Sequence, residues 1–186
     1  MLTSKQSLRE SIQYKLLAQS LVQRKQKSAL LGQKLLACPE YCGAHTVLFF
    51  VSLPEEVDTH RLIDEALKTG KRVVVPRCQT ETKALELYEI RDRKHLVPGV
   101  LGLLEPDPAV TKPVSAEEAD LVLVPGVVFD RQGNRIGRGA GFYDRFLKAL
   151  KPSVFKMGLA YAFQIVPSVP VEPHDVKLDR VLTEED

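Results

Sequence analysis

Apolar residues near the start of the chain recur at helical spacing. Leu8, Ile12 and Leu16 are each four residues apart, which places them on one face of an amphipathic helix. Ser4 and Ser20 stand where two such helices would begin, because a serine hydroxyl can accept a hydrogen bond from a free amide of the first turn. The sequence therefore predicts two N-terminal helices whose charged residues face solvent.

Later in the chain, predominantly apolar runs are typical of strands buried inside a sheet. These runs span residues 46–51, 72–76, 121–125 and 155–160. Residues 85–90 instead alternate apolar and polar side chains, as a half-exposed strand does. Helical patterns separate the runs: one helix is expected with Thr59 as its cap and Gly70 at its end, and another over residues 142–150. Strands that alternate with helices predict an α/β fold, with a mostly parallel central sheet flanked by helices.

Two other segments carry turn and proline signals. Residues 99–108 are rich in glycine and proline and are expected to cross the surface. In the tail, Pro167, Pro170 and Pro173 recur at regular intervals, which favours an extended chain over a helix. The chain has 186 residues and is 44% apolar, so residues 1–186 are expected to form a single domain.

Charge and cysteine content narrow the class of protein. The 26 basic and 24 acidic residues give a net charge of +2, and they are scattered, so we expect no nucleic-acid partner. No apolar run approaches the roughly 20 residues of a membrane span, so we expect no membrane partner and a cytoplasmic protein. Cys38, Cys42 and Cys78 form neither an even disulfide set nor a zinc pattern, which predicts free thiols. We also expect a monomer.

The densest chemical signal is a glycine-rich loop between a predicted strand and the helix over residues 142–150. Gly137, Gly139 and Gly141 alternate with Arg138 and Ala140, so the backbone can approach a bound group without side chains in the way. The helix that follows adds its N-terminal dipole, which favours an anion. Such a loop can also be a plain connector, and it is neither a Walker motif nor a dinucleotide fingerprint. The arginines and the aromatic pair that follows favour a phosphate-binding loop.

Acidic residues supply further candidates. Asp144 directly follows the loop, and Asp175 is a candidate second carboxylate for Mg²⁺, which prefers one or two carboxylates together with phosphate oxygens. Asp144 also suits the first turn of a helix without any metal. Glu55, Glu56 and Asp58 follow a predicted strand, at the sheet edge where α/β proteins hold ligands, although they would equally suit a surface loop. These residues alone predict an α/β protein that binds a phosphorylated ligand with Mg²⁺.

Two runs strongly resemble the signature of the 5-formyltetrahydrofolate cyclo-ligase family. They are VPGVVFD at residues 124–130 and GNRIGRGAGFYDR at residues 133–145. The N-terminal pair Lys5 and Arg9, the acidic loop at residues 52–59 and the Gly-x-x-Glu-Pro turn at residues 102–106 are similar to further family motifs. The tail, with His174-Asp175 and Thr183-Glu184, is similar to the closing motif of the family. The likeness covers nearly the whole chain.

The resemblance implies a fold and a reaction. The fold would resemble the sugar-phosphate isomerase and CoA-transferase-like group. In the family, ATP phosphorylates the formyl oxygen of 5-formyltetrahydrofolate, N10 attacks the activated carbon, and phosphate leaves as the 5,10-methenyl bridge closes. Phosphate is a far better leaving group than an amide oxygen. The implied partners are therefore ATP as cosubstrate, Mg²⁺ as cofactor and a reduced folate.

The resemblance also implies roles for individual residues. Catalytic roles would belong to Arg138, Tyr143 and Arg135. ATP would contact Lys5, Arg9, Arg135, Ile136, Gly137, Arg138, Gly139, Ala140, Gly141, Phe142 and Tyr143. The folate would contact Leu53, Asp58, Arg138, Gly139, Ala140, Gly141 and Phe142, and Mg²⁺ would be held by Asp144 and Asp175.

Two alternatives remain open. A cyclo-ligase-like fold could bind a nucleotide or folate without catalysis, as a regulatory module. Sugar-phosphate isomerisation is suggested only by analogy of fold. A requirement for ATP would separate the cyclo-ligase from both.

Overall fold

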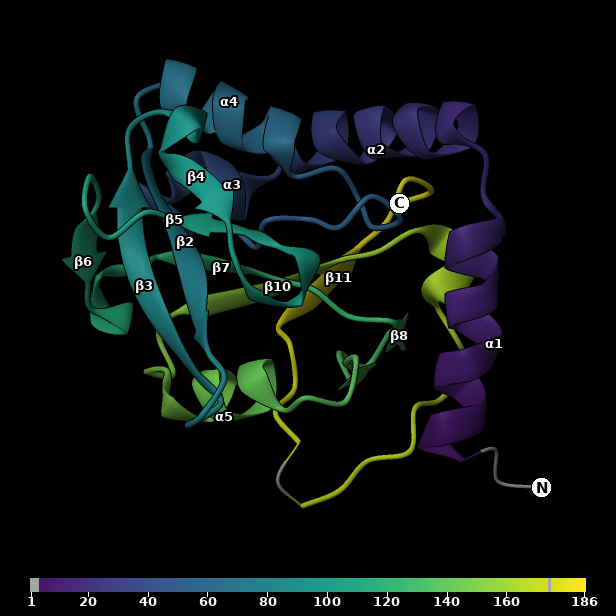
Figure 1. Ribbon diagram of the computed structural model, residues 1–186. Coiled ribbons are helices and arrows are strands. Elements are labelled where there is room, and N and C mark those ends of the chain that lie inside the picture. The colour runs from purple at the N-terminus through teal and green to yellow at the C-terminus, as the bar shows by residue number, and fades with distance from the viewer. Residues whose placement is uncertain (1–3, 174) are drawn as a thin grey trace.

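A seven-stranded sheet runs through the centre of the computed structural model, which describes residues 4–173 and 175–186 (Figure 1). From one edge to the other the strands are β11 (Arg180–Leu182), β10 (Phe155–Leu159), β7 (Leu121–Val124), β1 (Thr46–Leu48), β2 (Arg72–Gln79), β3 (Ala84–Ile90) and β6 (Lys112–Val114). The first five run parallel to one another, whereas β3 is antiparallel to both β2 and β6. The predicted α/β fold with a mostly parallel sheet is confirmed.

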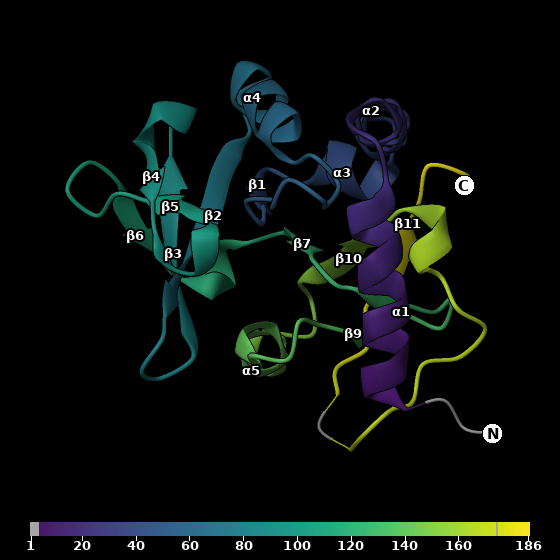
Figure 2. The ribbon, with the colours of Figure 1, turned by 45° about the vertical axis from the view of Figure 1, so that its right-hand side comes forward.

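Helices cover both faces of this sheet. They are α1 (Lys5–Ala18), α2 (Leu21–Leu36), α3 (Pro39–Gly43), α4 (His60–Lys68) and α5 (Phe142–Ala149). Figure 2 shows α2, α3 and α4 on one side of the strands, α5 on the other, and α1 standing across the end of the sheet. The crossover from β1 through α4 to β2 is a parallel βαβ unit, as the sequence predicts.

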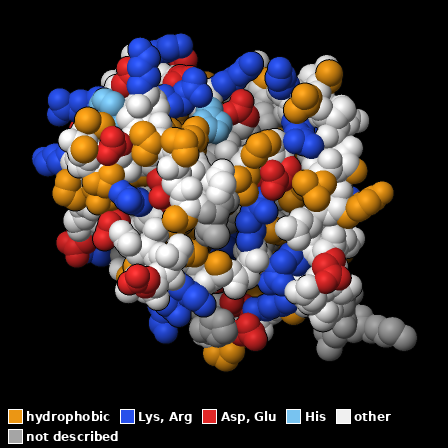
Figure 3. Space-filling view, in the orientation of Figure 1, with side chains coloured by type: hydrophobic (Ala, Val, Ile, Leu, Met, Phe, Trp, Pro, Cys, Tyr) orange, Lys and Arg blue, Asp and Glu red, His pale blue; other side chains and the backbone are white. Residues whose placement is uncertain are grey.

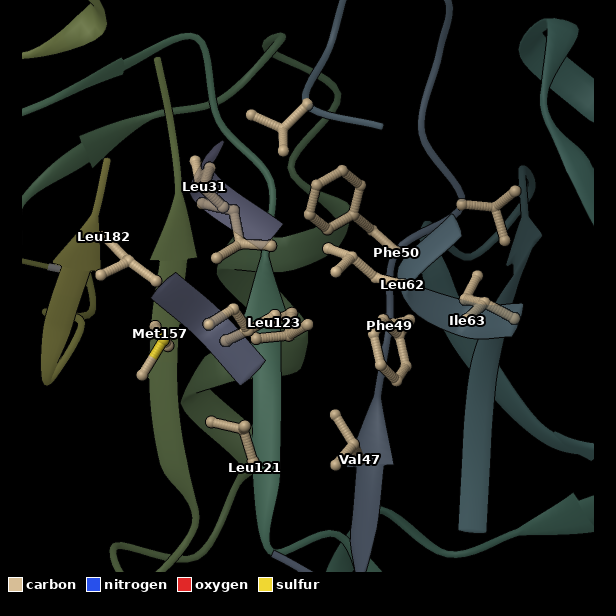
Figure 4. Close-up of a cluster of buried hydrophobic side chains, with 14 of the residues drawn as sticks. Leu31, Val47, Phe49, Phe50, Leu62, Ile63, Leu121, Leu123, Met157 and Leu182 are labelled. Carbon is tan, nitrogen blue, oxygen red and sulfur yellow. The ribbon is translucent and has the colours of Figure 1, made fainter. Parts of the chain in front are cut away.

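Two apolar clusters hold the layers together. In the larger one, Leu31 of α2 and Ile63 of α4 pack against strand residues such as Leu123 (Figure 4). In the smaller one, Phe146 and Leu147 of α5 pack on the opposite face of the sheet. Neighbouring residues of one strand contribute to different clusters because successive strand side chains point to opposite faces. The uninterrupted apolar runs are explained by burial on both sides.

The helix starts agree only in part with the prediction. The Ser4 and Ser20 hydroxyls accept hydrogen bonds from the amides of Ser7 and Gln23, so both predicted caps are confirmed. Thr59 is the residue before α4 but makes no side-chain cap, because its hydroxyl donates instead to the carbonyl of Phe50 at 2.7 Å. The prediction of a threonine cap is wrong at this position.

Several strand ends also differ. The run at residues 46–51 is a strand only as far as Leu48, although Phe49 to Val51 stay buried. The run at residues 72–76 extends to Gln79, because β3 continues to pair with it after β1 has ended opposite Val74. Strands β7 and β10 each end one residue earlier than expected, as does α5.

Two short antiparallel pairs complete the fold. Strands β4 (Leu96–Pro98) and β5 (Leu104–Pro106) form one, and β8 (Val128–Phe129) and β9 (Arg135–Ile136) form the other. The segment at residues 99–108 is therefore not only a surface crossing, because Glu105 in β5 is buried and accepts a hydrogen bond from the Cys78 amide. The proline-spaced tail is extended, and it returns to the sheet as the edge strand β11. In the described part of the chain all three cysteines are free thiols.

Candidate active site

The glycine-rich loop lies between β9 and the start of α5. The sequence does not reveal that the hairpin of β8 and β9 separates this loop from β7. Gly139 and Gly141 have φ angles of +100° and +78°, a region in which other residues are strained. Gly141 is the residue that precedes α5, so the amides of the first helical turn follow directly from the loop. This arrangement suits an anion.

The loop borders a cavity of about 380 Å³ at the carboxyl ends of β1, β2 and β7. Its lining comprises Phe50, Val51, Leu53, Glu56, Pro76, Cys78, Leu85, Leu103, Leu104, Glu105, Pro125, Gly126, Arg135 and residues 137–144. In open α/β sheets, ligands bind at this end of the strands. Several basic side chains gather near the middle of the face drawn in Figure 3. A cavity that is largely apolar with a few charged groups has the composition of a small-molecule site.

Arg135 is a deeply buried charge in the cavity wall. Its side chain is 4% exposed, and its Nη2 atom lies 2.5 Å from a carboxylate oxygen of Asp144. Burial lowers the pKa of the guanidinium, while Asp144, Tyr143 and Asp175 oppose that shift. Among the residues that the structure describes, the Nε–H of Arg135 has no hydrogen-bond acceptor. A buried donor without a partner points to a bound ligand, because leaving it unsatisfied is costly.

Arg138 reaches across the cavity to the acidic loop that follows β1. Its Nη2 atom lies 2.8 Å from Glu55 and 2.9 Å from Glu56, and its Nε atom also donates to Glu56. Burial raises the pKa of Glu56. Burial lowers the pKa of Arg138, but the two carboxylates outweigh this effect and leave the pKa of Arg138 raised. The glycine loop and the acidic loop are therefore joined by ion pairs.

Helix α1 approaches the glycine loop from outside. Arg9 donates from Nε to the carbonyl of Gly137 at 3.0 Å. A Cβ atom at Gly139 would lie 3.9 Å from the Arg9 guanidinium, in ordinary contact. One turn earlier, the Lys5 ammonium lies 2.7 Å from Glu172 and 2.7 Å from Asp175. The tail and the N-terminal helix thus meet beside the loop.

Tyr143 carries the second polar group of the cavity that has no partner. Its ring lies against the Arg135 guanidinium, 5.9 Å from centroid to carbon, and no described residue accepts or donates a hydrogen bond at its hydroxyl. Burial raises its pKa well above the usual range, so the phenol keeps its proton and can donate. Burial likewise raises the pKa of the Cys78 thiol to about 11, so this cavity cysteine stays protonated.

Most of the predicted site residues come together here. Leu53, Arg135, Gly137, Arg138, Gly139, Ala140, Gly141, Phe142, Tyr143 and Asp144 line the cavity. Lys5, Arg9 and Asp175 lie beside it through the contacts just described. The predicted residue His174 lies outside the described residues.

Two predicted residues lie elsewhere. Ile136 is buried in the hairpin, 2% exposed, and packs into the larger apolar cluster. Asp58 lines a separate cavity of about 210 Å³ between α2 and α4. Its carboxylate accepts a hydrogen bond from the His60 amide and lies 3.8 Å from Arg61. In this structure Asp58 caps α4, and its contact with a pterin stays a prediction.

Other cavity residues gave no functional signal in the sequence. Phe50 and Leu85 belong to apolar or alternating runs whose pattern reports burial alone, and Cys78, just past the run at residues 72–76, was expected only to be a free thiol. Glu105 lies in the Gly-x-x-Glu-Pro turn, which was the one available sign. Glu56 could be placed on the right loop, but not opposite Arg138, which is 82 residues away in the chain.

Asp144 and Asp175 suit Mg²⁺ in their chemistry. Both carboxylates act electrostatically on the same guanidinium, that of Arg135, so they belong to one neighbourhood. A magnesium ion bound to phosphate oxygens needs only one or two protein carboxylates. Within residues 4–173 and 175–186, no group of three or more His, Cys, Asp or Glu side chains is arranged to hold a metal by itself. The donor set therefore fits a metal that arrives with a phosphorylated ligand.

An α/β sheet with a glycine loop, a buried arginine and, among the described residues, unsatisfied donors at its carboxyl edge has the features of a site for a phosphorylated small molecule. Comparison with known proteins identifies the family. The profile of the 5-formyltetrahydrofolate cyclo-ligase family matches residues 1–184. The chain belongs to this family, and it is an enzyme of the cyclo-ligase class.

Individual relatives agree with this assignment. The chain is 33% identical to 5-formyltetrahydrofolate cyclo-ligase of Mus musculus, over 98% of this chain and 95% of that protein. It is 31% identical to the Escherichia coli K12 enzyme of the same name, over 87% and 90% of the two chains. The solved structure of Aquifex aeolicus 5,10-methenyltetrahydrofolate synthetase superposes with a TM-score of 0.86 at 32% identity, covering 98% of this chain and 90% of that one. In the described residues, no helix is long and apolar enough to cross a membrane.

Proposed function

We propose that this protein converts 5-formyltetrahydrofolate to 5,10-methenyltetrahydrofolate, with ATP hydrolysed to ADP and phosphate and with Mg²⁺ as cofactor. Given the family of the chain, one structural observation supports this proposal most directly. The cavity has the unsatisfied Nε–H of Arg135 and the unsatisfied hydroxyl of Tyr143 in one wall, next to a glycine loop. These donors suit the oxygens of a phosphoryl group.

The reaction divides into two transfers. The formyl oxygen attacks the γ-phosphorus of ATP, and ADP leaves. N10 of the folate then attacks the activated formyl carbon and gives up its proton to solvent, and phosphate leaves with the oxygen as the methenyl bridge closes. Bound Mg²⁺, held by Asp144 and Asp175, would offset phosphate charge. Such a transfer depends mainly on positioning and on charge neutralisation.

The residues of this chain have separate tasks in this scheme. Arg135 and Arg138 neutralise charge that develops on the transferred phosphoryl oxygens, and the protonated phenol of Tyr143 donates a hydrogen bond to the same group. Lys5 and Arg9 close the nucleotide end of the site from α1. Apolar lining residues such as Phe50 and Leu85 exclude water and contact the flat pterin ring.

The test is a near-ultraviolet absorbance time course of the purified protein with 5-formyltetrahydrofolate. The conjugated methenyl product absorbs where the substrate does not, so absorbance should rise only when both ATP and Mg²⁺ are present. Arg138→Ala and Asp144→Asn should each abolish the rise. Arg91→Ala is the matched control, because Arg91 is 84% exposed and pairs with Glu89, away from the cavity.

Other outcomes would favour the alternatives. ATP binding without any rise in absorbance would support a non-catalytic binding module. Turnover without ATP would contradict the proposal, and wild-type turnover in both site variants would show that the site is assigned wrongly. We further propose that the protein works as a monomeric, single-domain enzyme in the cytoplasm without a nucleic-acid partner, which sedimentation and cell fractionation test.

A further inference from the structure

The acidic loop between β1 and α4 presents Glu56 to the glycine loop, yet it has no regular secondary structure. At its base, Ser52 and Thr59 exchange hydrogen bonds, from the Ser52 amide to the Thr59 hydroxyl and from the Thr59 amide to the Ser52 hydroxyl. At its tip, the Leu53 amide donates to Glu56 Oε2 at 3.0 Å. These local bonds close the loop on itself. They do not fix its position relative to the rest of the fold.

Two hydroxyls from distant parts of the chain help to fix that position, in addition to Arg24 of α2, whose Nη1 atom donates to the Pro54 carbonyl at 3.0 Å. The Asp58 amide donates to Ser28 Oγ of α2 at 3.0 Å. Ser28 Oγ lies 3.0 Å from the Tyr161 hydroxyl, which donates to the Glu56 carbonyl at 2.9 Å. Tyr161 follows β10, so hydrogen bonds attach the acidic loop both to α2 and to the segment after β10.

The direction of each hydrogen bond follows from counting protons. A phenol has one proton, and Tyr161 gives it to the Glu56 carbonyl. Ser28 must then donate to the Tyr161 oxygen while it accepts from the Asp58 amide. The result is a directed chain from the Asp58 amide through Ser28 and Tyr161 to the Glu56 carbonyl. It pins the backbone on both sides of Val57, which is itself 1% exposed.

The pinned backbone determines where the Glu56 carboxylate lies. Glu56 Oε1 accepts from Nε of Arg138 at 3.1 Å and from Nη2 at 2.9 Å, so a single oxygen holds one edge of the guanidinium. The Nη1 group takes part in neither bond and is available to a ligand. Ser28 and Tyr161 do not line the 380 Å³ cavity themselves. Their influence on it passes through Glu56.

We propose that Ser28 and Tyr161 are positioning residues for the reaction: through the backbone of the acidic loop they set the Glu56 carboxylate, which orients Arg138 over the cavity. This inference rests on the proposed function for its kinetic consequence only. The hydrogen-bond chain itself exists without substrate, so it can be tested separately.

The kinetic test uses Tyr161→Phe and Ser28→Ala, each of which removes one hydroxyl. Each should lower kcat about tenfold, which corresponds to about 1.4 kcal/mol and lies within the range of a buried hydrogen bond, while KM for ATP and for the folate changes less than about twofold. Tyr41→Phe is the matched control, because Tyr41 is 3% exposed, its hydroxyl has no partner among described residues, and it belongs to α3. The control should keep wild-type kcat.

A double variant separates positioning from general destabilisation. In a Glu56→Gln background the orientation of Arg138 is already weakened, so adding Tyr161→Phe should lower kcat less than about twofold further. Independent tenfold losses in the double variant, or unchanged kcat in Tyr161→Phe and Ser28→Ala, would overturn the inference.

Hydrogen–deuterium exchange without substrate supplies the independent measurement. Tyr161→Phe and Ser28→Ala should speed exchange at residues 53–58 and at residues 137–141, and Tyr41→Phe should not. If the wild-type protein shows no ATP-dependent turnover, the proposed function fails, and this exchange result alone decides the inference. Faster exchange at both loops supports it. Unchanged exchange at residues 137–141 overturns it, because the acidic loop then does not act on Arg138.

Discussion

The hydroxyl of Tyr143 should make the protein less stable and more active at the same time. It is buried in the cavity wall and has no hydrogen-bond partner among the described residues. Replacing Tyr143 with phenylalanine removes the hydroxyl and leaves the ring, which packs against Arg135 and meets the Phe146 ring edge to face at 6.2 Å. The substitution therefore isolates one polar atom.

The expected size of the two effects follows from desolvation. A buried polar group without a partner costs about 1–3 kcal/mol, so Tyr143→Phe should stabilise the ligand-free protein by about 1–2 kcal/mol. In a chain of 186 residues this corresponds to a rise in Tm of about 2–8 °C. A hydrogen bond to a charged phosphoryl oxygen contributes about 1.5–3 kcal/mol, so kcat/KM should fall about 10- to 100-fold.

The assay combines urea or thermal unfolding of the ligand-free protein with the absorbance assay of methenyl formation. Tyr41→Phe again serves as the control, since the Tyr41 hydroxyl is also buried and has no partner in the part of the chain that the structure describes. Burial raises its pKa to about 12, and it lies far from the glycine loop in the fold. Tyr41→Phe should gain stability in the same way and keep full activity.

Opposite results would refute the reasoning in distinguishable ways. If Tyr143→Phe is destabilised, the hydroxyl has a partner in the free protein. If the variant is more stable but fully active, the hydroxyl does not contact the reacting groups. If Tyr41→Phe also loses activity, the kinetic effect reports overall packing and not the site.

Four further predictions follow from the structure. Asp144→Asn leaves the Arg135 guanidinium without its carboxylate, and since Asp144 is 41% exposed the loss in unfolding free energy should be about 1–2 kcal/mol by urea titration. Asp175→Asn should raise the Mg²⁺ concentration needed for half-maximal turnover, and chelation should stop the wild-type enzyme until excess Mg²⁺ is restored. Burial raises the pKa of Glu56 above its ordinary value of 4.5, so the folded state binds the proton more tightly than the unfolded state does, and the free energy of unfolding falls as pH rises between the two pKa values. The stability advantage of Glu56→Gln should therefore grow over this pH range, and a constant difference would contradict this. Gly133→Ala should lower the free energy of unfolding by more than about 2 kcal/mol in a thermal melt, because the φ angle of Gly133 is +87° and a Cβ atom would lie 2.2 Å from the Leu178 carbonyl oxygen. A variant with wild-type stability would contradict this prediction.

Local patterns in the sequence predict the elements well. The caps at Ser4 and Ser20, the buried strands and the glycine loop depend on residues a few positions apart, so spacing and side-chain chemistry suffice. Strand ends were less predictable. The length of β2 depends on its neighbours β1 and β3, and Thr59 is not a cap because its hydroxyl finds the Phe50 carbonyl across the loop.

The candidate site was likewise only partly predictable from the sequence. Its charged residues could be named because arginines among glycines before a helix suit an anion and a nearby aspartate suits a metal, and the resemblance to the cyclo-ligase family gave them roles. Their partners could not be named. Glu56 faces Arg138, whereas Asp58, two residues along, turns away to cap α4. An extended loop has no periodicity that tells its two sides apart.

The sequence by itself determined the fold class, the family and the loop proposed to bind the ligand, because these depend on local spacing and on motifs. Only the tertiary structure decided which carboxylate holds each arginine, which donors stay unsatisfied, and which hydroxyls pin the acidic loop. Ser28, Glu56 and Tyr161 lie on different elements and meet only because α2 covers the sheet beside β10 and β1. Contacts of this kind depend on strand order and helix packing, which the spacing of residues along the chain does not specify.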